Sequence, residues 1–121
     1  MIRSLFQDAG TSLPYLALAQ GLLINILSGK MNPGQRLPPV REIADSNGVC
    51  VTTAQRALEV LQREGLIITH RTKGKLVTSD AVQIESWKNR YIMIQMDLFI
   101  EKLHTLGLQD HEIRDRFLER L

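Results

Sequence analysis

The stretch "GLIITHRTKGKLV", residues 65–77, places two short apolar runs on either side of a basic segment. Leu66 to Thr69 and Leu76 to Thr78 have the apolar and β-branched composition of strands, and the segment HRTKG between them contains a glycine. Two such runs joined by a short glycine-containing loop are typical of a β-hairpin. The stretch therefore predicts a hairpin with a positively charged tip.

The tip of this hairpin carries Arg71, Lys73 and Lys75 around Gly74. Because side chains alternate along a strand, the three cations would lie on one side if strand geometry continued through the tip. Cations on a loop bring N–H donors and positive charge to phosphates, and a glycine lets the backbone approach closely. The same pattern also fits a solvated loop whose charges serve solubility, so the segments before the hairpin decide between the two interpretations.

Three helices are predicted before the hairpin, because apolar residues recur there at intervals of three and four. The first helix lies between Ser12, a candidate N-cap, and Gly29, a candidate C-terminal stop. A connector rich in proline and glycine, residues 31–39, leads to a short second helix over residues 40–48, and the third helix covers residues 49–65. The order helix, helix, helix, hairpin is that of a winged helix, whose third helix enters the major groove of DNA.

Composition favours one compact domain with a helical extension, since the chain has 121 residues and 44% of them are apolar. Its apolar runs are far shorter than the roughly 20 residues of a membrane span. The first ten residues lack the apolar run of a signal peptide, and Cys50 is the single cysteine. The sequence therefore favours a cytoplasmic protein without disulfides or a membrane partner.

The charges are unevenly divided along the chain. The net charge is only +2, but residues 1–79 hold nine Lys and Arg against five Asp and Glu, so this first part of the chain is basic.

Two segments carry a family resemblance: PGQRLPPVREIADSNGV, residues 33–49, and QRALEVLQREGLI, residues 55–67. They resemble the DNA-binding domain of the GntR family of bacterial transcription regulators. The pattern of that family runs G-x-x-L-P-S-x-R-x-L-A, then G-V, then A-x-x-x-L-x-x-E-G-L-I, and ends in a G-x-G-T wing. The positions that match its spacing are Gly34, Leu37, Pro38, Arg41, Ala44, Gly48, Val49, Ala57, Leu61, Glu64, Gly65, Leu66 and Ile67.

The tail KLHTLGLQDHEIRDRFLERL, residues 102–121, is similar to the short helical C-terminal region of the YtrA subfamily, and PYLALAQGLL, residues 14–23, is similar to its opening. This resemblance implies a mainly α fold with a small β-hairpin wing. A winged helix-turn-helix DNA-binding domain over residues 1–79 would be followed by two C-terminal helices for dimerisation over residues 80–121. Such a protein would be a DNA-binding transcriptional regulator, and we expect a repressor.

The chain departs from the family pattern at three places. Pro39 stands where the family usually has a serine that caps the second helix, although the fixed φ of proline suits a first helical turn. Residues 50–53 replace the usual Ser-Arg-x-Thr, so one arginine is absent, and Val51 can instead touch a thymine methyl group. Residues 72–75 replace Gly-x-Gly-Thr, which removes one glycine and adds a cation.

Arg41 matches the family arginine that contacts the DNA backbone or a guanine, as the resemblance implies. A guanidinium group suits either role, because it forms bidentate hydrogen bonds. The alternative is a surface ion pair with the neighbouring Glu42 or Asp45.

The start of the third helix supplies the other predicted DNA contacts, because side chains and unpaired backbone N–H groups both point at the groove there. Thr52 and Thr53 are predicted to contact phosphates, whereas Gln55 and Arg56 are predicted to read bases; solvated helix positions are the alternative for each. The complete predicted DNA-binding set is Arg41, Val51, Thr52, Thr53, Gln55, Arg56, Arg71, Lys73, Gly74 and Lys75.

Two apolar stripes are predicted on a long helix after residue 80. The first consists of Ile84, Trp87, Tyr91, Ile94 and Leu98, and the second of Ile92, Met96, Phe99 and Leu103. One stripe can pack on the core of the chain, and the other then needs a partner; alternatively both fold back on the same chain. A last amphipathic helix follows Gly107 and can stabilise a dimer of two chains. The predicted dimer contacts are Trp87, Tyr91, Ile94, Leu98, Phe99, Ile113 and Phe117.

A two-fold dimer presents two recognition helices, which predicts a palindromic operator in double-stranded DNA. Its half-site centres are expected to lie about one helical turn, roughly 10 bp, or somewhat more apart.

Rival functions rest on fewer residues. Asp97, Glu101 and His104 fall at i, i+4 and i+7, a spacing that can build a metal site with His111 and Glu112 nearby, but solvated helix positions explain them more simply. We expect no metal or other cofactor, and sensing of a small-molecule effector stays an alternative, as does a winged helix that docks proteins. Catalysis is not expected, because the sequence has no nucleophile elbow and no glycine-rich phosphate loop after a strand.

Overall fold

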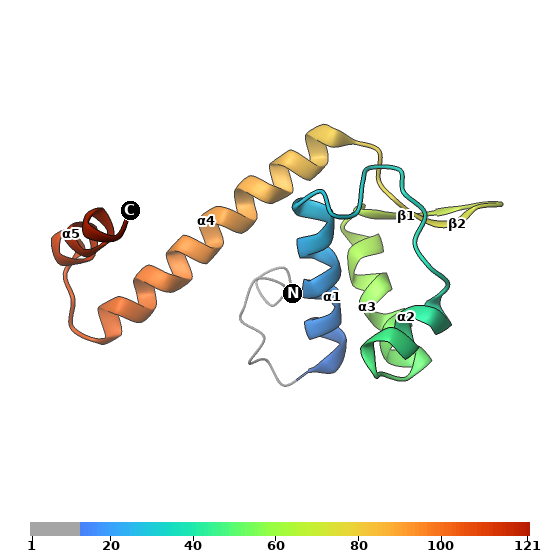
Figure 1. The fold of residues 1–121 in the computed structure, drawn as a ribbon, viewed down its shortest axis with the longest axis horizontal. Helices are drawn as coiled ribbons and strands as arrows, with labels where there is room; N and C mark the ends of the chain where they lie inside the picture. The colour runs from blue at the N-terminus through green and yellow to red at the C-terminus, as the bar shows by residue number, and fades with distance from the viewer. Residues whose placement is uncertain (1–12) are drawn as a thin grey trace.

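The computed structural model describes residues 13–121 as a cluster of three helices and a hairpin, from which a long helix extends and ends in a last, separate helix (Figure 1). The elements are α1 (Pro14–Leu27), α2 (Val40–Asn47), α3 (Val51–Arg63), β1 (Ile67–His70), β2 (Gly74–Val77), α4 (Ala81–Thr105) and α5 (Asp110–Arg120). This arrangement confirms the prediction of a mainly α winged helix with two C-terminal helices.

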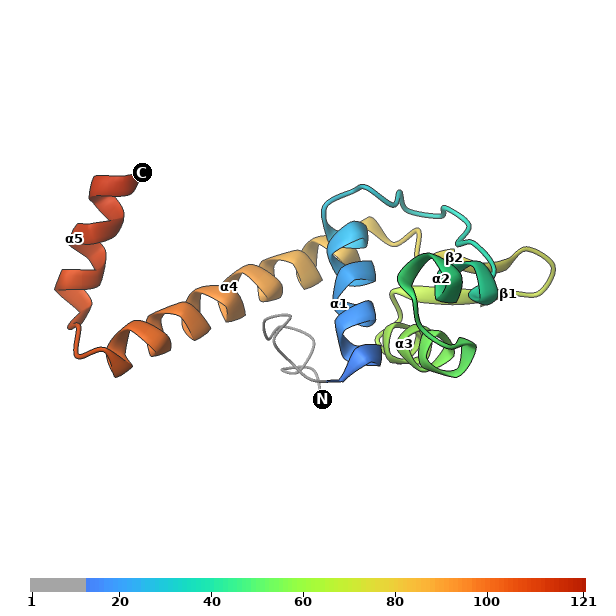
Figure 2. The ribbon, with the colours of Figure 1, turned by 60° about the horizontal axis from the view of Figure 1, so that its bottom comes forward.

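Helix α1 is the centre of the core, because it lies between α3 on one side and the start of α4 on the other (Figures 1 and 2). A helix packed on two sides needs apolar residues around most of its circumference. Accordingly Leu16, Leu23 and Ile26 are buried together with their neighbours on the adjoining faces. The N-cap position is Leu13, without a side-chain cap. Ser12, the cap predicted from the sequence, lies outside the described residues.

Helices α2 and α3 form a helix-turn-helix with a three-residue turn. Pro39, with φ of −56°, precedes the first turn of α2, and Gly48 ends the helix in the left-handed region at φ of 64°. The backbone N–H of Val49 then donates to the carbonyl of Ala44 over 3.0 Å and closes the turn. On α3 the stripe Ala54, Ala57, Leu58 and Leu61 is at most 1% exposed. The two alanines leave room for the close approach of α1 and α2.

The hairpin is antiparallel, with Ile67 opposite Val77 at its base and His70 opposite Gly74 next to its tip. A third extended segment joins β2 through the bridge between Arg36 and Leu76. The three cations are expected on one side of the hairpin only if strand geometry continues through its tip. Residues 71–73 instead form a turn, so this condition is not met. The base of the hairpin is buried in the core, and its outer half projects into solvent (Figure 2).

Gly65 connects α3 to the wing at φ of 74°, a conformation that disfavours any side chain. A Cβ there would also lie 2.8 Å from Nε2 of Gln83, which donates to the carbonyl of Glu64 over 2.9 Å. Gly65→Ala should therefore lower the free energy of unfolding by about 1–3 kcal/mol, measured by urea denaturation. Gly29→Ala is the matched control, because φ is 83° but the space is open. The Gly65 variant should lose about 1 kcal/mol more, since the hydrogen bond of Gln83 must break; equal losses would contradict this account.

Helix α4 begins directly after the wing. The Asp80 carboxylate accepts from the backbone N–H of Gln83 over 3.1 Å, which caps the helix, and the Thr78 hydroxyl accepts from the backbone N–H of Asp80 over 3.2 Å. The first turns bury Ile84 and Trp87 in the core of the winged helix. Beyond them the helix leaves the domain, and its distal half extends away from α1 and α3 (Figure 1).

Three predicted dimer contacts on α4 instead serve the chain's own core. Trp87 is only 4% exposed and packs in the core of its own chain, so it offers little surface to a partner. Tyr91 and Ile94 are half-buried and pack against the same core. The reason is that α1 packs against the first stripe along the first three turns of α4. Leu98, the last residue of that stripe, is half-buried.

Helix α5 folds against the end of α4 after Gly107, which has φ of 86°. The side chains of Gln109 and Glu112 form a capping box at its start, and Nε2 of His104 lies 2.6 Å from Oδ1 of Asp110 across the turn. Ile113 is 5% exposed, so it too is buried within its own chain rather than presented to a partner. Among the predicted contacts, Phe99 and Phe117 are exposed and Leu98 is half-buried.

Within residues 13–121, the helices are all too short or too polar to cross a membrane.

Candidate nucleic-acid interface

The start of the helix-turn-helix exposes two helix N-termini without side-chain caps. The N-cap positions are Pro39 for α2 and Cys50 for α3, and neither side chain accepts a hydrogen bond from its helix. By contrast, the side chains of Asp80 and Gln109 cap α4 and α5. The first backbone N–H groups of α2 and α3 therefore keep their donors for an anion, and a phosphate is the natural partner of such a terminus.

Arg41 lies in the first turn of α2, next to one of these termini, and its side chain is exposed. Within the part of the chain that the structure describes, it forms no ion pair with Glu42, Asp45 or any other carboxylate. The alternative of a surface ion pair therefore has no support, and the guanidinium donors face solvent.

The first turn of α3 presents the predicted residues unequally. Thr52 and Gln55 are exposed, whereas Val51 and Thr53 are half-buried, and Val51 packs against the core. The Thr53 hydroxyl lies 3.1 Å from Sγ of Cys50. That hydrogen bond is the main cause that lowers the pKa of the exposed Cys50 thiol below its ordinary value. Part of the hydrogen-bonding capacity of the Thr53 hydroxyl is thus used at the start of its own helix.

The two predicted base readers lie on different flanks of α3. The guanidinium of Arg56 stacks over the ring of Tyr15 at 4.0 Å from its centroid, which holds Arg56 on the flank next to α1. Successive residues of a helix are rotated by about 100°, so Gln55 lies on the other flank, two turns before Gln62. Tyr15 was not singled out from the sequence, because the contact joins residues that are far apart in the chain.

The wing presents two of its three cations at the tip. Arg71 and Lys73 lie in the exposed turn, and Gly74 follows with φ of 80°. The ring nitrogen Nδ1 of His70 accepts from the backbone N–H groups of Thr72 and Lys73 over 3.2 and 3.1 Å and so holds the turn. His70 is a second residue that sequence reasoning missed, although it stands in the segment HRTKG.

The third cation is held differently. Lys75 lies in β2, is half-buried, and its Nζ donates to Oε1 of Gln62 on α3 over 3.1 Å. Arg41, Thr52, Gln55 and the two cations of the wing tip are thus all exposed, whereas Lys75 lies between the wing and α3.

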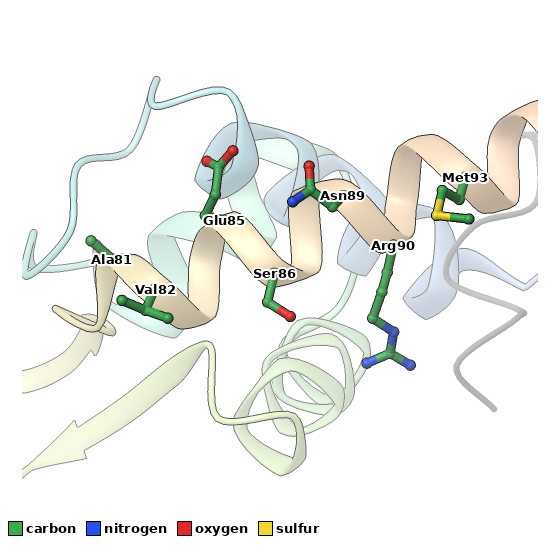
Figure 3. A pocket seen from close by; sticks show the side chains of 7 residues that line it. All are labelled: Ala81, Val82, Glu85, Ser86, Asn89, Arg90 and Met93. Carbon is green, nitrogen blue, oxygen red and sulfur yellow. The ribbon is translucent and has the colours of Figure 1, made fainter.

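A shallow hollow of about 600 Å³ runs along the first half of α4 (Figure 3). Its lining residues are Ala81, Val82, Glu85, Ser86, Asn89, Arg90 and Met93. Because one helix supplies every lining side chain, this hollow is a strip of helix surface and not a site where polar groups from several elements converge. It carries the strongly exposed Val82 and Met93.

The predicted metal-ligand spacing on α4 does not assemble a site. In the described residues, no three His, Cys, Asp or Glu side chains come close enough to hold a metal ion. His104 pairs with Asp110 of α5.

The helix-turn-helix and wing match the model of the bacterial regulatory proteins of the gntR family over residues 14–77. The HTH-type transcriptional repressor YtrA of Bacillus subtilis is 30% identical over 110 residues, which cover 89% of this chain and 85% of that protein. The structure is similar to that of a GntR family transcriptional regulator from Listeria monocytogenes, with a TM-score of 0.81 and 28% identity over 95% of this chain and 99% of that one. YtrA from Sulfolobus acidocaldarius matches with a TM-score of 0.52 and 26% identity over 93% of this chain and 91% of its own.

These matches extend through α4 and α5, beyond the DNA-binding domain, which agrees with the predicted YtrA-like arrangement. The chain belongs to the gntR family of bacterial regulatory proteins and is a DNA-binding transcriptional regulator of the YtrA-like subfamily.

Proposed function

We propose that the chain represses transcription by binding a palindromic operator as a homodimer. The observation that carries this proposal is the uncovered second stripe of α4, in which Ile92, Met96 and Phe99 are 46%, 59% and 45% exposed. Similarity to the repressor YtrA supports the direction of regulation. Since such a protein acts on DNA without catalysis, we place it in the bacterial cytoplasm.

In this proposal residues 1–79 bind DNA. Thr52 and Gln55 enter the major groove with the first turns of α3, and Arg41 and the uncapped helix starts contact the adjacent phosphates. The wing tip, with Arg71, Lys73 and Gly74, binds phosphates beside the groove. The remaining predicted contacts are Val51, Thr53, Arg56 and Lys75, of which Arg56 and Lys75 reach the DNA only from the edges of the interface.

Residues 80–121 couple two copies. The distal half of α4 extends away from the winged helix, which therefore leaves the second stripe of α4 exposed (Figure 1). An edge-to-face contact of Phe99 with Phe117, with ring centroids 5.5 Å apart, joins this stripe to α5. A continuous apolar strip of this length is uncommon on a monomer, and a two-fold related copy supplies an equal strip to cover it.

Selection of bound fragments from the genome of the source organism, followed by footprinting, tests the proposal. The expected footprint is a palindrome with two protected half-sites whose centres lie roughly 10 bp or somewhat more apart. The mass of the complex should correspond to two chains on one duplex. One asymmetric footprint per chain would contradict dimeric binding.

The wing tip should control the salt dependence of binding. For Arg71→Ala/Lys73→Ala the slope of log K against log salt, measured by fluorescence anisotropy between about 50 and 200 mM salt, should fall by roughly 0.9 for each phosphate contact that is lost. Lys88→Ala/Arg114→Ala removes the same charge from exposed positions of α4 and α5 and should leave the slope nearly unchanged. Equal slopes for wild type and the wing variant would exclude phosphate contacts at the tip.

A further inference from the structure

One side-chain amide joins the recognition helix to both strands of the wing. Nε2 of Gln62 donates to the hydroxyl of Thr69 on β1 over 2.6 Å, and Oε1 of the same amide accepts from Nζ of Lys75 on β2 over 3.1 Å. Thr69 and Lys75 are partners in the register of the hairpin. The amide therefore binds a facing pair of residues, one from each strand, and uses its donor and its acceptor at the same time.

This contact lies in the outer half of the wing. The base of the hairpin is fixed by burial, with Ile67 2% and Val77 1% exposed. The Thr69–Lys75 pair is next to the last pair before the turn, where the outer residues of β1 are exposed. An isolated two-stranded ribbon is marginally stable in water and bends easily, so a contact near its end controls its direction more than one at its base.

We infer that Gln62 is a positioning residue for DNA binding, which fixes the angle between α3 and the wing and thereby the place of Arg71 and Lys73. The inference rests on the proposed role of those two cations. Gln62 lies two turns after Gln55 on the same flank of α3, so the amide holds the wing on the side where Gln55 meets the DNA. Lys75 acts mainly through this contact, because its ammonium group is directed at α3.

The test compares two substitutions at one position. Gln62→Leu keeps the approximate size of the side chain and removes both hydrogen bonds. Gln62→Glu keeps two acceptor oxygens, which can receive the Lys75 ammonium and the Thr69 hydroxyl at once. A role in positioning therefore predicts loss with leucine and recovery with glutamate, whereas simple filling of space predicts that leucine suffices.

In the free protein, the backbone amide resonances of residues 71–74 should shift in Gln62→Leu and their heteronuclear NOE values should fall, with wild-type values restored in Gln62→Glu. Operator affinity of the leucine variant should fall on the order of tenfold, because two hydrogen bonds no longer hold the wing in place before it binds. Adding Arg71→Ala/Lys73→Ala to it should cost less than the same change costs the wild type, because misplaced cations contribute less.

Unchanged wing resonances in Gln62→Leu, or additive losses in the double-mutant cycle, would overturn the inference. Thr69→Val supplies a second variant that leaves α3 intact and removes one hydrogen bond, so it should give a smaller change of the same kind. The NMR measurements need no DNA. A wild-type protein that ignores duplex DNA would therefore refute the proposed operator binding and leave the wing geometry to be judged separately.

Discussion

Phe99→Glu should split the dimer into monomers and lower the affinity for the operator by about 100-fold or more, because two linked half-site contacts bind far more tightly than one. The substitution places a charge in the middle of the uncovered stripe of α4, where a partner would have to desolvate it. Light scattering gives the mass of the protein, and fluorescence anisotropy on the selected operator gives the affinity.

Phe99 is chosen because it is exposed on α4 and also contacts α5. Its side chain is 45% exposed, so its replacement leaves the winged-helix core intact, and its ring also meets the ring of Phe117 in α5 edge to face. Phe99→Leu is the control, since it keeps an apolar side chain there and should stay dimeric. A Phe99→Glu protein that keeps the dimer mass would show that copies meet through another surface, and a monomeric wild type would refute the proposed dimer altogether.

Leu23→Ala should lower the free energy of unfolding by about 2–5 kcal/mol, a large part of the roughly 5–15 kcal/mol that stabilises a typical domain. Leu23 is 0% exposed at the centre of α1, where removal of three carbon atoms leaves a cavity between α1 and the helices on both sides. Chemical denaturation at one fixed protein concentration measures the loss.

The neighbouring position provides a matched control for this prediction. Ile24 is on the same helix and is 46% exposed, so Ile24→Ala removes a similar amount of apolar side chain without opening a cavity in the core. Its effect should stay below about 1 kcal/mol. Similar losses at the two positions would mean that α1 is not packed as the structure has it.

The helix-turn-helix could be predicted from the sequence because its signals are local. Pro39 starts α2, and Gly48 and Gly65 end α2 and α3 in left-handed conformations that favour glycine. The Leu58 and Leu61 side of α3 is apolar at helical spacing, so its buried face also followed from the sequence alone.

The parts that could not be predicted depend on contacts between distant segments. Two apolar stripes on α4 have the same periodicity, and only the docking of α1 decides that Trp87 is buried while Phe99 is exposed. In the same way, the charge pattern of the sequence predicts that Lys75 binds phosphate at the wing tip as Lys73 does. Its contact with Gln62 exists only once the hairpin has folded back along α3.

Helix α4 is one unbroken element of 25 residues that begins in the core of the winged helix and ends at α5. At 1.5 Å per residue it is about 37 Å long, comparable with the spacing of successive major grooves on one side of a duplex. In a dimer joined at the distal ends of α4, the length of this helix sets the separation of the two winged-helix domains. Each residue added to α4 would also turn the DNA-binding domain of each copy by about 100° relative to the joined ends, so a change in helix length would require a change in the operator.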